Sequence, residues 1–403
     1  MNIRISQFIK NFVLNLIGCV IPIVLLQLYI YPQIAQEVGG NQYGRILSMI
    51  GLLTLVAEPL GSALNNSRLI LQSEYEKKDD WGDSNLLLLF SIPINIISLL
   101  IMAIFYMKEN EITTIILLVI ISSLLMMQKF YSVYFRIQLD YMRSMICSVV
   151  LCAGYIMGLI VFKSGYSFWW IYIIGYAFGL AFVIWRNPLV KEPCRKTSLF
   201  YRGVKINITL VFVEFSNSFI KYADRLLLYP LLGGNAVSIY YAASIISKMI
   251  AMAVSPMSTV ILSYLSKINK IGNRVLSVML GAIFMVAMVG YFLCIFISKP
   301  ILMWLYPHWY TESLAIVNIT TATAVIDAIG MIVRPIILRY KKLKFQYVIS
   351  LTNLILYVFF AYSFYFKWGL KGFCIGILFN SIIQLIIKIL IVIRTSNSYI
   401  GEL

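Results

Sequence analysis

Histidine and paired cysteine are scarce in this chain of 403 residues, and their scarcity excludes several kinds of site. His308 is the only histidine, so a histidine-based metal or catalytic centre cannot be built. The six cysteines stand singly, mostly inside apolar runs, without metal-ligand spacing. Isolated cysteines in apolar segments usually pack as small hydrophobic side chains. The sequence therefore predicts neither a bound metal nor a disulfide.

Charge is also scarce. Asp, Glu, Lys and Arg make up 12% of the residues, whereas soluble domains contain about 25%. Hydrophobic residues make up 61%, and the mean hydropathy is +0.88. The chain also lacks a P-loop, a G-x-S-x-G elbow and a cluster of histidine with carboxylates. We therefore expect a polytopic membrane protein that is not an enzyme and that holds no cofactor.

Apolar runs long enough for one bilayer crossing, about 20 residues, recur along the whole chain. They predict an all-α fold with about twelve transmembrane helices, at 10–31, 43–65, 85–107, 112–135, 142–162, 168–186, 206–230, 236–264, 275–298, 312–338, 345–366 and 371–393. The first ten residues are short and basic and continue into a full span, so no cleavable signal peptide is expected.

Basic residues gather on one side of the predicted spans. That side includes Arg68, Lys77, Lys78, Arg136, Arg143 and the basic residues between 186 and 205. The opposite connections carry only scattered lysines, so the positive-inside rule places both termini in the cytoplasm. The net charge of +17 lies in short loops. It favours the lipid bilayer and anionic substrates as partners over nucleic acid.

The longest polar interval, 186–205, contains two prolines and predicts a break between domains. We expect an N-terminal six-helix bundle at 1–190, a basic cytoplasmic linker at 191–205 and a C-terminal six-helix bundle at 206–403. A short repeat supports this division. Tyr31-Pro32 followed by Gly39-Gly40-Asn41 recurs as Tyr229-Pro230 followed by Gly233-Gly234-Asn235. Repeats of this kind are common in transporters.

The predicted span 206–230 carries four ionisable residues, although each costs about 2.5–3.5 kcal/mol at bilayer depth. Glu214, Lys221 and Arg225 share a helical face, and Asp224 lies one turn after Lys221. Other spans hold Glu58, Lys129, Lys248, Asp327 and Arg334. We expect Arg136 and Lys388 to snorkel to the inner interface.

Two interpretations of these charges stay open. They form either a salt-bridge cluster that only joins helices or a cationic face along a transport path. The cations match or outnumber the acids and lie at different depths, which favours the path. The candidate anion-binding residues are Lys221, Arg225, Lys248, Lys129 and Arg334. The candidate coupling or charge-pair residues are Asp224, Glu214, Asp327 and Glu58.

Several segments resemble a known family. They are Tyr222-Ala-Asp-Arg-Leu-Leu-Leu, Leu232-Gly-Gly-Asn-Ala-Val-Ser-Ile-Tyr-Tyr-Ala-Ala, Gly61-Ser-Ala-Leu through Arg68, and Trp368-Gly-Leu-Lys-Gly. These segments resemble the Wzx-type flippases, polysaccharide biosynthesis proteins of the multidrug/oligosaccharidyl-lipid/polysaccharide (MOP) exporter superfamily.

The resemblance implies a MATE-like fold of two bundles around a central cavity. It also implies outward flipping of undecaprenyl-diphosphate-linked oligosaccharide across the bacterial inner membrane, for O-antigen or capsule. Cations in the cavity would then meet the diphosphate headgroup. This role transfers to Asp224 and Arg225, and more loosely to Arg68. A polysaccharide polymerase and its chain-length machinery become expected partners.

The alternative is a cation-coupled multidrug antiporter of the same superfamily. Its substrates are mostly cationic, so the excess of buried cations argues against it. A membrane polymerase or ligase is a third reading, but it requires a large outer loop that the sequence does not offer. Coupling to H⁺, to Na⁺ or to the membrane potential alone stays open.

Overall fold

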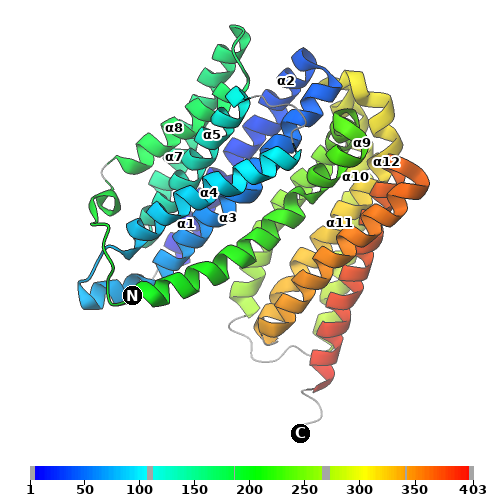
Figure 1. The fold of residues 1–403 in the computed structure, drawn as a ribbon. Coiled ribbons are helices and arrows are strands. Elements are labelled where there is room, and N and C mark those ends of the chain that lie inside the picture. The colour runs from blue at the N-terminus through cyan, green and yellow to red at the C-terminus, as the bar shows by residue number, and fades with distance from the viewer. Residues whose placement is uncertain (1–4, 107–111, 186, 266–272, 341–342, 399–403) are drawn as a thin grey trace. The chain divides into compact units, whose positions relative to one another are not determined.

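The computed structural model is almost entirely α-helical and describes residues 5–106, 112–185, 187–265, 273–340 and 343–398 (Figure 1). Its helices are α1 (Ile5–Val24), η1 (Leu25–Ile30), α2 (Tyr31–Val38), α3 (Gly40–Lys78), α4 (Asp83–Tyr106), α5 (Ile112–Tyr131), α6 (Val133–Ile137), α7 (Tyr141–Lys163), α8 (Trp169–Ile184), η2 (Pro188–Lys191), α9 (Phe200–Leu265), α10 (Asn273–Leu305), η3 (Pro307–Trp309), α11 (Tyr310–Tyr340) and α12 (Leu343–Ser398). These residues contain no strand, and the predicted all-α membrane fold is confirmed.

The helices match the predicted crossings. Among the described residues, nine stretches are long and apolar enough to span a bilayer, and α8 is a shorter apolar helix. Two long helices are interrupted by non-helical residues, α9 at Gly233 and α12 at Trp368 and Gly369. Gly233 and Gly369 have φ of 77° and 56°, a conformation that glycine adopts without steric cost. Each interruption falls between two predicted spans, so each of these helices contains two of the predicted crossings.

Contacts divide the chain into two compact units, which we describe separately. Unit 1 comprises Met1–Ile34 and Ile46–Pro230, and unit 2 comprises Ala35–Arg45 and Leu231–Leu403. In unit 1, α7 packs against α8 and α1, and α5 packs against α8 and α4. In unit 2, α11 packs against α12 and α10. The predicted boundary at the linker and the duplication of six helices stay predictions.

Helix α3 is the most enclosed of the candidate spans. In its most apolar window 89% of the residues are buried, against 11% to 50% in the other long spans. A helix that is covered on every side lies in the interior of a bundle. Side chains of α3 therefore have fixed surroundings, and charged groups on it need partners from neighbouring helices.

The two Gly-Gly-Asn motifs lie against each other inside unit 2. The first glycine of each has nearly the same conformation, with φ of 75° and 77°. A Cβ added to Gly40 would overlap the side chain of Asn235, and one added to Gly234 would overlap the carbonyl oxygen of Asn41. The reciprocal contact gives a packing reason for the glycines of both motifs, and their relation as repeats stays a prediction.

Gly234→Ala tests this contact, because its new methyl group would meet backbone atoms that cannot rotate away. Overpacking costs about 1–3 kcal/mol. We expect the melting temperature of the detergent-purified protein to fall by about 1–4 °C. Gly290→Ala in α10 is the matched control, since a Cβ there meets nothing within 4 Å. Equal melting temperatures for the two variants would contradict the close packing of the turns.

Candidate functional site

A polar site in unit 1 is built where α3 meets α5 and the first segment of α9. A Cβ on Gly61 would lie 2.8 Å from Lys129 Cβ of α5, so a glycine at this position of α3 allows α5 to approach closely. A Cβ on Gly51 would lie 3.8 Å from Tyr222 Cβ of α9, an ordinary van der Waals contact, so α9 packs beside α3 without requiring a glycine there.

Glu58 of α3 lies between two lysines from these neighbouring helices. Its Oε1 is 3.7 Å from Lys129 Nζ and its Oε2 is 3.4 Å from Lys221 Nζ. Tyr222 Oη also donates to Oε2, at 3.4 Å. The Glu58 side chain is 21% exposed, whereas those of Lys129 and Lys221 are 44% and 59% exposed. One carboxylate neutralises one of two ammonium groups, so the cluster keeps a positive charge that is open to a ligand.

Asp224 and Arg225 lie buried just beyond Lys221 on the same helix. The backbone amide of Arg225 donates to Asp224 Oδ1 at 2.8 Å. The ring centre of Tyr222 is 4.8 Å from Lys221 Nζ and 5.8 Å from the Arg225 guanidinium carbon. Cations at these distances are attracted to the face of an aromatic ring. Tyr222 therefore connects both predicted cations to Glu58, a role that sequence analysis did not assign to it.

A second polar chain extends from the same region to Glu214. Asn66 Nδ2 donates to Glu214 Oε1 at 3.3 Å. Arg136 Nη1 donates to the side-chain oxygens of Asn65 and Asn66 at 2.6 and 2.8 Å. Arg136 was expected to reach the inner interface, but its guanidinium is tied to these asparagines. Its spacing of seven residues from Lys129, about two helical turns, is the sequence signal that could have placed it here.

Arg68 belongs to a different cluster of unit 1. Its side chain is 1% exposed, and its Nη2 lies 2.7 Å from Glu192 Oε1. Its guanidinium carbon lies 4.8 and 4.7 Å from the ring centres of Tyr75 and Trp81. Burial raises the pKa of the Glu192 carboxyl, and the charge of Arg68 opposes that shift. A guanidinium enclosed in this way is closed to a lipid headgroup, so the substrate role of Arg68 stays a prediction that its burial argues against.

The predicted linker is attached to the same end of unit 1. Asn85 Nδ2 donates to the carbonyl oxygens of Leu189 and Glu192 at 2.8 and 2.9 Å. Asp83 accepts hydrogen bonds from the amide and the hydroxyl of Thr197. The start of the linker is therefore a packed segment held by buried side chains.

Unit 2 holds the remaining predicted residues. Lys248 Nζ lies 5.6 and 5.7 Å from the ring centres of Tyr240 and Tyr241. Asp327 and Arg334 of α11 both interact with Lys388 of α12. These three charges form a second cluster with more cations than acids.

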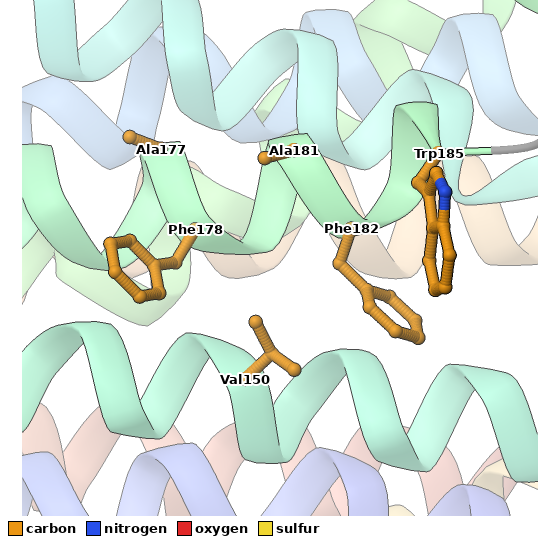
Figure 2. A pocket seen from close by; sticks show the side chains of 6 residues that line it. All are labelled: Val150, Ala177, Phe178, Ala181, Phe182 and Trp185. Carbon is orange, nitrogen blue, oxygen red and sulfur yellow. The ribbon is translucent and has the colours of Figure 1, made fainter.

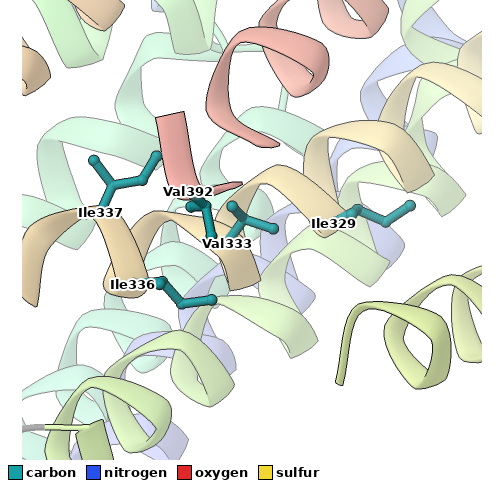
Figure 3. Packing of buried hydrophobic residues seen from close by; sticks show 5 residues of the cluster. All are labelled: Ile329, Val333, Ile336, Ile337 and Val392. Atoms are coloured by element: carbon teal, nitrogen blue, oxygen red, sulfur yellow. The ribbon is translucent and has the colours of Figure 1, made fainter. Parts of the chain in front are cut away.

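The ammonium of Lys388 in α12 lies beside Gly330 of α11. A Cβ on Gly330 would lie 2.9 Å from Lys388 Nζ, so the missing side chain of this glycine makes room for the ammonium. The neighbouring turns of α11 and α12 form an apolar cluster of Ile329, Val333, Ile336, Ile337 and Val392 (Figure 3). The snorkelling of Lys388 stays a prediction, and the structure shows its ammonium against α11, where Asp327 attracts it.

An apolar groove between α7 and α8 lies apart from these charges. It has a volume of about 560 Å³ and is lined by Val150, Ala177, Phe178, Ala181, Phe182 and Trp185 (Figure 2). Trp185 at its end is 66% exposed. A groove with apolar walls and an exposed aromatic rim is typical of a lipid-facing seam.

Comparisons with known proteins find the fold but no family. No protein-family model and no curated protein matches the chain. An inward-facing multidrug resistance MATE family transporter of the MOP superfamily matches with a TM-score of 0.68 at 14% identity, covering 95% of this chain and 98% of that one. The lipid II flippase MurJ, in an inward closed conformation, matches with a TM-score of 0.68 at 17% identity, covering 96% and 88%.

A MATE transporter of Vibrio cholerae matches with a TM-score of 0.61 at 16% identity, covering 98% of this chain and 97% of that one. The chain therefore has the fold of MOP superfamily transporters, as the resemblance implied. These three neighbours are transporters and a flippase. The narrower resemblance to Wzx-type flippases stays a prediction.

Arg68→Ala and Lys221→Ala separate a structural role of the charges from a functional one. Arg68→Ala leaves Glu192 without its buried partner, a loss that costs about 3–5 kcal/mol. Lys221→Ala breaks an exposed pair, which is worth about 0–1 kcal/mol. We expect thermal unfolding in detergent to show a clear loss of stability for Arg68→Ala and a near-native Lys221→Ala. Equal destabilisation by Lys221→Ala would make the cluster around Glu58 a structural joint between helices.

Proposed function

We propose that this protein flips undecaprenyl-diphosphate-linked oligosaccharide from the cytoplasmic to the outer leaflet of the bacterial inner membrane, for O-antigen or capsule. The proposal rests chiefly on the open, net positive cluster of Lys129 and Lys221 around Glu58, within spans of unit 1. We propose alternating access as the transport mechanism, with both termini in the cytoplasm.

The chemistry of the cluster suits a diphosphate. Moving a phosphate group through hydrocarbon without compensation costs tens of kcal/mol. Ammonium and guanidinium groups replace the lost water with charge-assisted hydrogen bonds. Lys129 and Lys221 lie within 4 Å of the two oxygens of one carboxylate, so both can reach a single small anion.

The structural neighbours support a lipid-linked substrate, because one of them is named as a lipid II flippase. For coupling, we propose Asp224, Glu214, Asp327 and Glu58 as candidate carboxylates for H⁺ or Na⁺, with the membrane potential as the other source of energy. The flipped product would pass to a polysaccharide polymerase and its chain-length machinery.

A cation-coupled multidrug antiporter is the second candidate. Two of the three neighbours described above are MATE transporters, and one of these is named as a multidrug resistance transporter. Glu58 and Glu214 are carboxylates that a cationic drug would require. The antiporter reading, however, leaves Lys129 and Lys221 beside the drug, where like charges repel it.

Flipping in proteoliposomes tests the proposal directly. A fluorescent short-chain prenyl diphosphate linked to one sugar is incorporated, and its movement is followed by quenching from outside. We expect Lys129→Ala and Lys221→Ala to slow flipping by about tenfold or more, since each removes a charge-assisted hydrogen bond worth about 1.5–3 kcal/mol. Lys163→Ala, which removes an exposed cation at the end of α7, should match the wild type.

Two bacterial strains separate the candidate functions. In a strain without its own flippase, the wild type should restore surface glycan, while the cation variants accumulate the lipid-linked intermediate at matched expression. In a strain without drug efflux pumps, the wild type should leave drug sensitivity unchanged. Drug resistance without any restored glycan would favour the antiporter. If every cation variant restores surface glycan, the charges serve only as structural contacts and the proposed anion site is contradicted.

A further inference from the structure

The anion site of unit 1 is already occupied by an anion of the protein. Glu58 Oε1 and Oε2 face Lys129 and Lys221 at 3.7 and 3.4 Å, where the diphosphate oxygens of a substrate would bind. An incoming diphosphate can contact both lysines only if Glu58 gives them up. The position of this carboxylate therefore bears on how the site binds and releases its ligand.

We propose that Glu58 is a tethered counter-anion: it holds Lys129 and Lys221 while the site is empty, yields both to the substrate diphosphate and takes up a proton as they leave. This inference rests on the proposed function and deepens it. It assigns Glu58 as the coupling carboxylate among the four candidates.

The geometry shows which partner moves. Charge-assisted N–H···O bonds are about 2.7–2.9 Å long, so the contacts of 3.4 and 3.7 Å are loose. Glu58 is carried by the enclosed helix α3 and is 21% exposed. The two lysines are far more exposed and have flexible four-carbon stems. The ammonium groups can therefore swing to a ligand while the carboxylate stays in place.

The groups around Glu58 explain why it would take up a proton when the lysines leave it. The titratable groups that face it are Lys129 of α5, Lys221 and Tyr222 of α9, and Tyr176 of α8. When both lysines turn to the diphosphate, only two phenols remain beside Glu58. A carboxylate that has lost its cationic partners and lies next to another anion favours its protonated form. Protonation in turn frees the lysines, so acid should strengthen diphosphate binding, and the loss of the proton should help to expel the ligand.

Glu58→Gln tests this exchange, because the amide keeps the shape and loses the charge. The purified full-length protein is titrated with geranylgeranyl diphosphate and, in parallel, with inorganic pyrophosphate. At pH 7.5 we expect Glu58→Gln to bind geranylgeranyl diphosphate about tenfold more tightly than the wild type, since no resident anion competes. Wild-type affinity should rise toward pH 5.5, and the affinity of the variant should not. Glu37→Gln, an exposed carboxylate of α2, is the control and should behave as the wild type.

Turnover should change in the opposite direction. Without a carboxylate to reclaim the lysines, release slows, so Glu58→Gln should lower both the maximal flipping rate and the KM in proteoliposomes. A merely structural Glu58 would give weaker binding and a raised KM. A second measurement does not depend on the variant: adding the prenyl diphosphate to the wild type in weak buffer should take up about one proton per bound ligand.

The outcomes separate the two proposals. If the wild type binds neither diphosphate probe, the proposed function fails and this inference fails with it. If the wild type binds a probe but takes up no proton, or Glu58→Gln binds equally or more weakly, the counter-anion role is overturned while the flippase proposal stands. The exchange involves only contacts between the lysines and phosphate oxygens. If pyrophosphate binds as tightly as the prenyl diphosphate, these contacts account for recognition and the counter-anion role is supported.

Discussion

A charge inside a membrane protein needs a partner of opposite charge or access to water, and this constraint organises both units. Helix α3 shows its strength, because it is the most enclosed span and still carries Glu58 and Arg68. Partners for these charges come from segments far away in the sequence: Lys129 and Lys221 for Glu58, and Glu192 for Arg68. The segments that pack around α3, namely α5, α9 and the linker, therefore also supply the partners of its charged side chains.

The two clusters of α3 meet the same constraint in opposite ways. Arg68 is 1% exposed and lies beside two aromatic rings and a carboxylate, so its guanidinium is enclosed and its charge is closed off. Lys221 is 59% exposed and shares its carboxylate with a second lysine. The first arrangement can only stabilise, whereas the second leaves charge for a ligand. Exposure distinguishes the two more clearly than the identity of the residues does.

Much of the fold was predictable from the sequence, because hydropathy reports each crossing by itself. Where the structure describes the predicted spans they are largely helical, and the turn at Gly233 falls where glycine predicts a boundary. Pairing was not predictable in the same way. The partners of Glu58 lie 71 and 163 residues away along the chain, and only packing brings them together. The position of Lys388 was not predictable for the same reason. Its ammonium fits beside Gly330, and hydropathy does not report such a contact between helices.

The arrangement of charges around Glu58 also bears on the proposed flipping of an anionic headgroup. A site must be stable while it is empty, so a transporter of anions needs an internal anion, and a transporter of cations needs an internal cation. The group that stays in place is best carried by an enclosed helix, and the groups that exchange partners by long, exposed side chains. Here the carboxylate is on α3 and the exposed, flexible groups are lysines. This division of roles suits the anionic headgroup proposed above, because the lysines are the groups that can leave the carboxylate and turn to a ligand.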